Sequence, residues 1–111
     1  MKISYSTKKV EKCFSDYSVM KRSIDPDWVR IIKKHIDRLE ASNDFGIFLS
    51  IGLGHPEPLT GDKTGMWSLR ISSNVRLIFT PINYIELTKC TEIRIEGVAD
   101  YHGSKPTWYI F

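Results

Sequence analysis

The chain has 111 residues, a formal net charge of +3 and a pI near 8.9. This length predicts a single domain over residues 1–111, with a core that needs no metal or disulfide to hold it together. The charge permits nucleic-acid binding, but many ordinary domains carry as much, so charge alone decides little.

The cysteines and the apolar segments indicate the compartment. Cys13 and Cys90 are the only cysteines and form no C-x-x-C pair, and the first residues do not resemble a secretion signal. The longest apolar runs are far shorter than a membrane span. We therefore expect a cytoplasmic protein without membrane contact, in which both cysteines are core or surface thiols.

The N-terminal part of the chain predicts a short strand followed by a helix. Residues Lys2–Ser6 alternate weakly, as in a strand, and Thr7 can cap a helix from Lys8 to about Asp16. The apolar residues of this helix fall on one face: Val10, Cys13 and Phe14. A turn is expected after it.

A second helix has the clearest start signal in the sequence. Asp25 can cap it, Pro26 suits its first position, and Asp27 complements the positive end of the helix dipole. The helix should reach about Ser42. Its buried stripe comprises Trp28 or Val29, Ile32, Ile36 and Leu39. Its charged face comprises Arg30, Lys33, Lys34, Asp37 and Arg38, and is either solvated or bound by a partner.

The second half of the chain predicts a sheet. A short turn of helix is expected within Gly46–Gly54, and Gly65–Ser72 and Val75–Pro81 form a hairpin. After a loop over Pro81–Thr88, the strand Glu92–Ala99 closes the sheet, with Ile93 and Ile95 inward and Arg94 and Glu96 outward. The fold class is α+β: two N-terminal helices pack on one face of a small, mostly antiparallel, twisted sheet whose other face is partly open.

Four short motifs follow one another in this half. They are Leu59-Thr60-Gly61-Asp62, Met66-Trp67-Ser68-Leu69-Arg70-Ile71, Asn74-Val75-Arg76-Leu77-Ile78-Phe79 and Asp100-Tyr101-His102. Strand alternation sends Trp67, Leu69 and Ile71 to one face and Ser68, Arg70 and Ser72 to the other. Arginines on a solvated sheet face suit a polyanion, and a histidine nearby can move a proton near neutral pH.

In this order the motifs resemble the HigB toxins of bacterial toxin-antitoxin systems, within the RelE/ParE superfamily. The resemblance implies a RelE-like fold and an endoribonuclease that cuts mRNA on the ribosome. It also implies a HigA-like helix-turn-helix antitoxin as partner, through which the toxin-antitoxin complex binds operator DNA.

RNA can be cut without metal when its 2′-hydroxyl attacks the adjacent phosphate, which needs a base, an acid and cations. The candidates for catalysis are His102, Tyr101, Arg76 and Arg70. Two of them have a structural alternative: His102 can end a strand, and Tyr101 can belong to the core. The candidates for RNA binding are Lys63, Arg94, Asp100, Lys105 and His55. No metal ligand spacing or cofactor motif is present, so we expect neither a metal nor a cofactor.

The sequence departs from HigB relatives in three places. Relatives often have a basic residue where this chain has Thr60, and several have a histidine where it has Glu57. His55 lies two residues before Glu57 and is either a substitute for that histidine or a solvated loop residue. The third departure is the extension 103–111, whose apolar residues could add an edge strand, cover the core or seal an interface between copies. We expect Trp108, Tyr109, Ile110 and Phe111 to pack near the end of the Asp-Tyr-His strand.

Because the sequence departs from the HigB pattern, two alternatives to the endoribonuclease stay open: a ParE-like toxin acting on gyrase, and an inactive subunit of a repressor.

Overall fold

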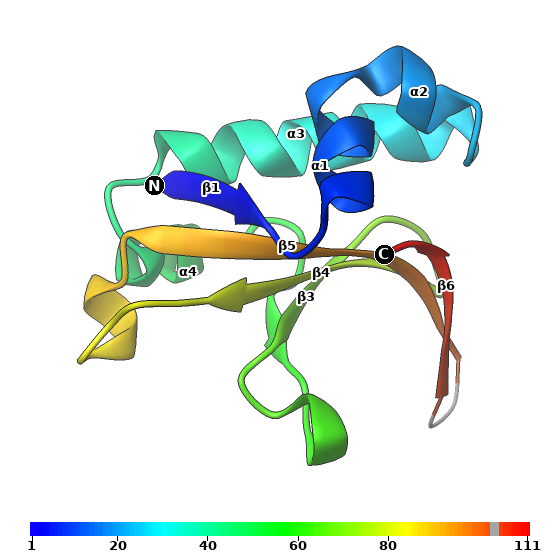
Figure 1. Cartoon of the computed structure of the whole chain (residues 1–111). Coiled ribbons are helices and arrows are strands. Elements are labelled where there is room, and N and C mark those ends of the chain that lie inside the picture. The colour runs from blue at the N-terminus through cyan, green and yellow to red at the C-terminus, as the bar shows by residue number, and fades with distance from the viewer. Residues whose placement is uncertain (103–104) are drawn as a thin grey trace.

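The computed structural model describes residues 1–102 and 105–111, and for His102 only the backbone. The sheet has six strands, and Figure 1 shows the helices of residues 8–41 on one side of it. The helices are α1 (Lys8–Ser15), α2 (Tyr17–Lys21), α3 (Pro26–Ala41) and α4 (Phe45–Ile51), with 3-10 turns η1 (Gly61–Lys63) and η2 (Leu87–Lys89). The strands are β1 (Lys2–Tyr5), β2 (Glu57–Pro58), β3 (Trp67–Arg70), β4 (Val75–Pro81), β5 (Glu92–His102) and β6 (Lys105–Ile110).

The sheet has the order β1-β5-β4-β3-β2, and β6 also pairs with β5. Only the β1–β5 pair is parallel among the strand pairs of the described residues. The predicted α+β class, with helices on one face of a mostly antiparallel sheet, is confirmed. None of the helices in residues 1–102 and 105–111 is long and apolar enough to cross a membrane.

The helix starts follow the capping chemistry of the sequence. The Thr7 hydroxyl oxygen accepts a hydrogen bond from the Val10 amide at 3.1 Å, and the Asp25 carboxylate accepts one from the Asp27 amide at 2.8 Å. The expected turn after α1 is instead the short helix α2. The Asp16 carboxylate begins it by accepting hydrogen bonds from the amide and the hydroxyl of Ser18, which lower the pKa of Asp16.

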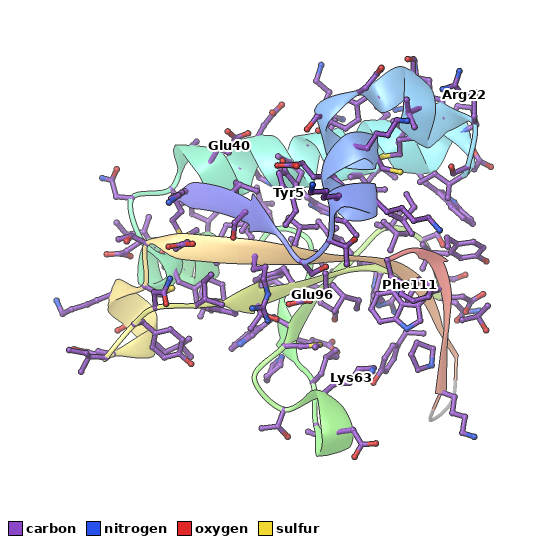
Figure 2. The ribbon with its side chains drawn as sticks, in the orientation of Figure 1. Tyr5, Arg22, Glu40, Lys63, Glu96 and Phe111 are labelled. Atoms are coloured by element: carbon purple, nitrogen blue, oxygen red, sulfur yellow. The ribbon has the colours of Figure 1, made fainter. Side chains whose placement is uncertain are left out.

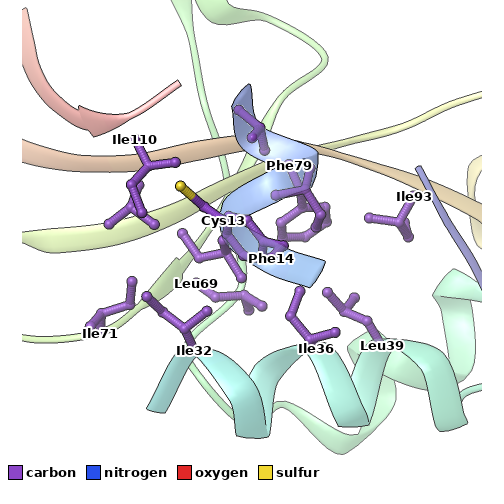
Figure 3. Close-up of a cluster of buried hydrophobic side chains, with 14 of the residues drawn as sticks. Cys13, Phe14, Ile32, Ile36, Leu39, Leu69, Ile71, Phe79, Ile93 and Ile110 are labelled. Atoms are coloured by element: carbon purple, nitrogen blue, oxygen red, sulfur yellow. The ribbon is translucent and has the colours of Figure 1, made fainter. Parts of the chain in front are cut away.

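The core lies between α1, α3 and the near face of the sheet, as Figure 3 shows. Val29, rather than Trp28, belongs to the fully buried stripe of α3. The fully buried large residues include Phe45, Phe79, Met20, Ile32, Leu39, Leu69, Leu77, Ile93 and Ile95. Phe45, the first residue of α4, packs edge-on against both Trp67 and Phe79 and so joins α4 to the hairpin of β3 and β4.

Strand β5 serves two partners along one of its edges. Its first half pairs with β1 and its second half with β6, while β4 occupies the opposite edge. Gly97 lies where the partner changes, with a φ of 152° that favours glycine. A Cβ atom at this position would overlap the carbonyl oxygen of Ile110. The close approach of β6 to β5 therefore requires a glycine.

The C-terminal residues pack only in part as expected, because Tyr109 and Phe111 are 39% and 58% exposed. Ile110 is 1% exposed and joins the core, and the ring of Tyr109 lies 5.4 Å from that of Trp28 on α3. The Trp108 ring lies 5.5 Å from that of Phe111. Of the three alternatives for the extension, the edge strand is confirmed. Gly103 and Ser104 lie outside the described residues.

Candidate functional site

The open face of the sheet carries a row of side chains that crosses four strands. Arg70 on β3 lies opposite Arg76 on β4, Arg76 lies opposite Ala99 on β5, and Ala99 lies opposite Trp108 on β6. Directly opposed residues share a face of the sheet, and Leu69, next to Arg70, belongs to the core on the other face. The two arginines are therefore neighbours on the face without helices, as predicted.

A second row lies beside the first. Glu57 on β2 is opposite Ser68 on β3, Ser68 is opposite Ile78 on β4, and Ile78 is opposite Gly97 on β5. Ser68 is only 4% exposed and Ile78 is fully buried, although Ile78 lies outside the core cluster. The expectation of a solvated face is thus wrong at Ser68. Figure 1 shows the segment containing η1 on this side of the sheet.

Arg76 is held rigidly. Its Nη1 donates to the carbonyl oxygens of Ser72 at 2.7 Å and Val75 at 3.0 Å, and its Nη2 donates to that of Ser73 at 3.1 Å. Burial lowers the pKa of Arg76 and the charge of Arg70 lowers it further, whereas the Glu57 and Asp100 carboxylates raise it. The charge of Glu57 therefore acts directly on the arginine pair.

A cleft of about 610 Å³ lies between η1 and the paired strands β5 and β6, and Lys63 in its wall contacts Trp108 at the end of the first row. Its lining residues are Thr60, Gly61, Asp62, Lys63, Tyr101, Lys105 and Pro106. Three predicted site residues, Lys63, Tyr101 and Lys105, are thus brought together. Tyr101 is two residues from Ala99 on β5 and so lies on the open face with the arginine row.

The other candidates are placed elsewhere. The Arg94 Nε donates to the Glu96 carboxylate at 2.9 Å, and His55 is exposed on a loop outside the cleft lining. Asp100 pairs with Val75 of the core and so lies on the helix side, where it accepts a 3.5 Å hydrogen bond from the Tyr109 hydroxyl. His102 continues β5 opposite Lys105. Its side chain lies outside the described part of the chain.

A smaller hollow of about 240 Å³ lies between α3 and α4. Its lining is mainly apolar: Arg38, Ala41, Ser42, Asn43, Ile47, Phe48, Ile51 and Leu53. It contains none of the candidate catalytic or RNA-binding residues. The candidate site is therefore the cleft at η1 together with the arginine row. Among the described residues, no group of three or more His, Cys, Asp or Glu side chains could hold a metal ion.

Sequence reasoning missed His35, which is 2% exposed on α3. Its Nε2 donates to the carbonyl oxygen of Arg70 at 2.7 Å, and its Nδ1 accepts from Nη2 of Arg38 at 2.5 Å. Arg38, expected to face water, is half-buried by this contact. The three-residue step from Ile32 to His35 is the helical spacing that could have indicated burial. His35 thereby fixes the backbone of Arg70 against α3.

We expect the free energy of unfolding to fall as the pH drops below about 6.5. Burial is the main cause that lowers the pKa of His35 from 6.5, so the unfolded chain binds a proton before the folded one does. The contribution of neutral His35 to the free energy of unfolding is therefore fully present above about pH 6.5. It decreases below that pH, by at most about 1.4 kcal/mol per pH unit. Denaturant titrations at several pH values measure this. His35→Gln should remove the effect and His55→Gln should not; an unchanged pH profile in His35→Gln would contradict the assignment.

The fold is similar to a solved YoeB/ParE toxin from Agrobacterium tumefaciens, with a TM-score of 0.59, 25% identity, and coverage of 92% of this chain and 99% of that one. It is also similar to a chain of the solved YoeB-YefM complex from Staphylococcus aureus, with a TM-score of 0.57, 24% identity, and coverage of 92% of this chain and 97% of that one. The fold is thus that of a small bacterial toxin.

The family follows from the sequence comparison. Residues 10–92 match the YoeB-like toxin of bacterial type II toxin-antitoxin systems, so the chain belongs to this family. Toxin YoeB of Streptomyces coelicolor is 44% identical over 52 residues, which are 47% of this chain and 60% of that protein. The matched segment therefore spans less than two thirds of this relative.

The assignment to HigB is wrong, because the family model and the curated relative both specify YoeB. Glu57 and Thr60 count as departures only in a comparison with HigB toxins. Because the chain does not belong to that family, neither residue indicates a missing functional group. Glu57 becomes the carboxylate that lies on the open face beside the arginine pair.

Proposed function

We propose that this toxin is an endoribonuclease that cuts mRNA on the ribosome by metal-independent attack of the 2′-hydroxyl on the adjacent phosphate. The supporting observation is the open face of the sheet, where the Glu57 carboxylate lies beside the Arg70–Arg76 pair and next to a cleft lined by Lys63 and Lys105. Cations and a proton acceptor are thereby gathered where a single RNA strand has access.

In this proposal Glu57 removes the proton of the 2′-hydroxyl, whose oxygen then forms a bond to phosphorus. The bond from phosphorus to the 5′-oxygen breaks, and an acid protonates that oxygen. Arg76 and Arg70 stabilise the extra charge on the phosphate oxygens. Tyr101 contacts a base or the phosphate from the cleft wall. The acid is His102, a role that rests on its position in the sequence alone.

Lys63 and Lys105 bind the flanking phosphates as mobile point charges. For the regulatory partner we propose a YefM-type antitoxin, because the S. aureus relative is solved as a YoeB-YefM complex. We further propose that the toxin acts in the cytoplasm and that its complex with the antitoxin binds operator DNA through the antitoxin.

Glu57→Gln is expected to lower the rate of RNA cleavage about 100- to 10,000-fold while leaving the fold intact, because it keeps the size of the side chain but removes the base. Glu57 is exposed on the short strand β2, so its replacement removes no buried contact. Single-turnover cleavage of a labelled message measures the rate, and Glu40→Gln on α3 is the matched control. Wild-type cleavage by Glu57→Gln would show that another group is the base.

Primer extension on cellular messages after induction tests the function itself. Cuts within translated codons are expected for a ribosome-dependent nuclease. DNA damage without RNA cuts would instead support a gyrase poison, and neither effect would support a repressor subunit. The specific observation that favours these alternatives is the commitment of both Arg76 Nη atoms to backbone carbonyls.

A further inference from the structure

Trp108 occupies one end of the arginine row, on the strand that follows the matched family segment. The ammonium group of Lys63 lies over its indole ring, 5.7 Å from the ring centre. Lys63 belongs to η1 and lines the cleft, so this contact connects the two walls of the cleft. Figure 2 shows Lys63 extending from η1 towards β6. Phe111 packs against Trp108 in a tilted arrangement.

Resting on the nuclease function proposed above, we propose that Trp108 is a base-stacking subsite for single-stranded RNA. An unpaired nucleobase takes the place of the Lys63 ammonium on the indole face. The displaced ammonium then binds the phosphate of the same strand. The Lys63–Trp108 contact is the closed state of the subsite, and RNA opens it.

The energetic order of the two contacts supports this exchange. An exposed cation–π contact changes an equilibrium constant by about 2- to 5-fold. Stacking of one base on an aromatic side chain changes it by about 5- to 150-fold. The base therefore displaces the ammonium from the ring. Lys63 retains a favourable position, because a phosphate is a better partner for its charge than an aromatic face.

The placement of Trp108 also fits RNA bound at the arginines. Trp108 lies opposite Ala99, and Ala99 lies opposite Arg76, so two strand spacings of about 10 Å in total separate the two backbones. Both side chains leave the same face of the sheet. A base on Trp108 and a phosphate at Arg76 thus belong to nearby nucleotides of one strand, which makes Trp108 a determinant of the position of the cut.

The first test measures binding of a single-stranded RNA that cannot be cut because deoxynucleotides replace its nucleophilic 2′-hydroxyls. The indole N–H signal of Trp108 in an NMR spectrum is assigned as the one that Trp108→Phe removes. Titration with the RNA should shift this signal and leave that of Trp28 in place. Trp28 is the matched control, because it also packs on β6, through Tyr109, but lies on α3. A Trp108 signal that stays in place at saturation would overturn the proposal.

The second test compares affinities. Trp108→Leu retains apolar bulk without a ring and should weaken RNA binding about 5- to 150-fold, whereas Trp108→Phe should recover part of that loss and Trp28→Phe should bind as wild type. Equal binding by Trp108→Leu and wild type would overturn the proposal. If the leucine variant fails to fold, the NMR titration and the RNA affinity of Trp108→Phe still test whether a base stacks on Trp108.

The third test concerns Lys63. Lys63→Met keeps the length of the side chain and removes one phosphate contact, so the slope of log affinity against log salt should decrease by about 0.7. An unchanged slope would overturn the exchange of partners. Cleavage by the wild-type protein tests the nuclease function separately: binding that shifts Trp108 without any cleavage would refute the nuclease and leave the subsite in place.

Discussion

Replacing Gly97 with alanine is expected to detach β6 from β5 and to lower stability and activity together. A side chain at this φ is strained by about 1–3 kcal/mol, and its Cβ would overlap the Ile110 carbonyl oxygen. Displacing Ile110 would also remove a buried side chain that contributes about 1.5–3 kcal/mol. Together these predict a loss of about 2.5–6 kcal/mol and a fall in Tm of about 10 °C or more.

Calorimetry and RNA cleavage measure the two effects. Gly52→Ala is the matched control, because Gly52 also has a left-handed backbone, at φ 73°, but its added Cβ meets no atom within 4 Å. It should lower stability by only about 1 kcal/mol and leave cleavage unchanged. If Gly97→Ala melted no lower than Gly52→Ala, the tight contact between β5 and β6 would not exist in solution.

Arg76→Ala should reduce the cleavage rate about 100- to 1,000-fold, the effect of removing one donor that stabilises charge in a transition state. The loss should appear in the rate of the bound complex much more than in RNA affinity. Stability should fall as well, because the backbone carbonyls of Ser72, Ser73 and Val75 each lose a hydrogen bond, although that of Val75 still accepts from the Ile71 and Ser72 amides. The cleavage rate of Arg76→Lys should lie between those of wild type and Arg76→Ala, since one ammonium group cannot reproduce the planar set of donors of a guanidinium.

The control for Arg76 is Arg30→Ala, which removes an exposed arginine on α3 that pairs with Asp27 at 3.5 Å. It should change neither the cleavage rate nor, by more than about 1 kcal/mol, the stability. Equal losses of rate and RNA affinity in Arg76→Ala would make this arginine a docking residue instead of a catalytic one.

The helices were predictable because their signals are local. Asp25, Pro26 and Asp27 mark the start of α3 by capping and dipole interactions that act within one turn. Helix α2 has only five residues, too few for an apolar period to emerge, and was predicted as a turn. Helical spacing could have indicated the burial of His35, but not its hydrogen-bond partner, a carbonyl of β3 thirty-five residues further along the chain.

The site was predictable only where strand alternation determines it. Alternation placed Arg70 and Arg76 on the open face, and the structure makes them direct neighbours. It could not show that Arg94 pairs with Glu96, or that Ser68 is covered. The four short motifs indicated a toxin of this fold but the wrong family, because each covers only a few residues, whereas the YoeB-like match extends over residues 10–92. Because of this wrong assignment, Glu57 was interpreted as a departure from the family pattern and not as a candidate site residue.

The position of β5 in the sheet has a consequence for how the chain folds. This strand forms hydrogen-bonded pairs with β1, β4 and β6, and its pairing with β1 joins residues ninety positions apart. During synthesis, β1 and all four helices are made before β5, so the sheet on which the helices pack has no central strand until then. The β4–β5 and β5–β6 pairs are short-range and can form quickly, whereas the β1–β5 pair has the largest loop to close. A nascent chain therefore cannot complete the open face or form the cleft until β5 and β6 have been made.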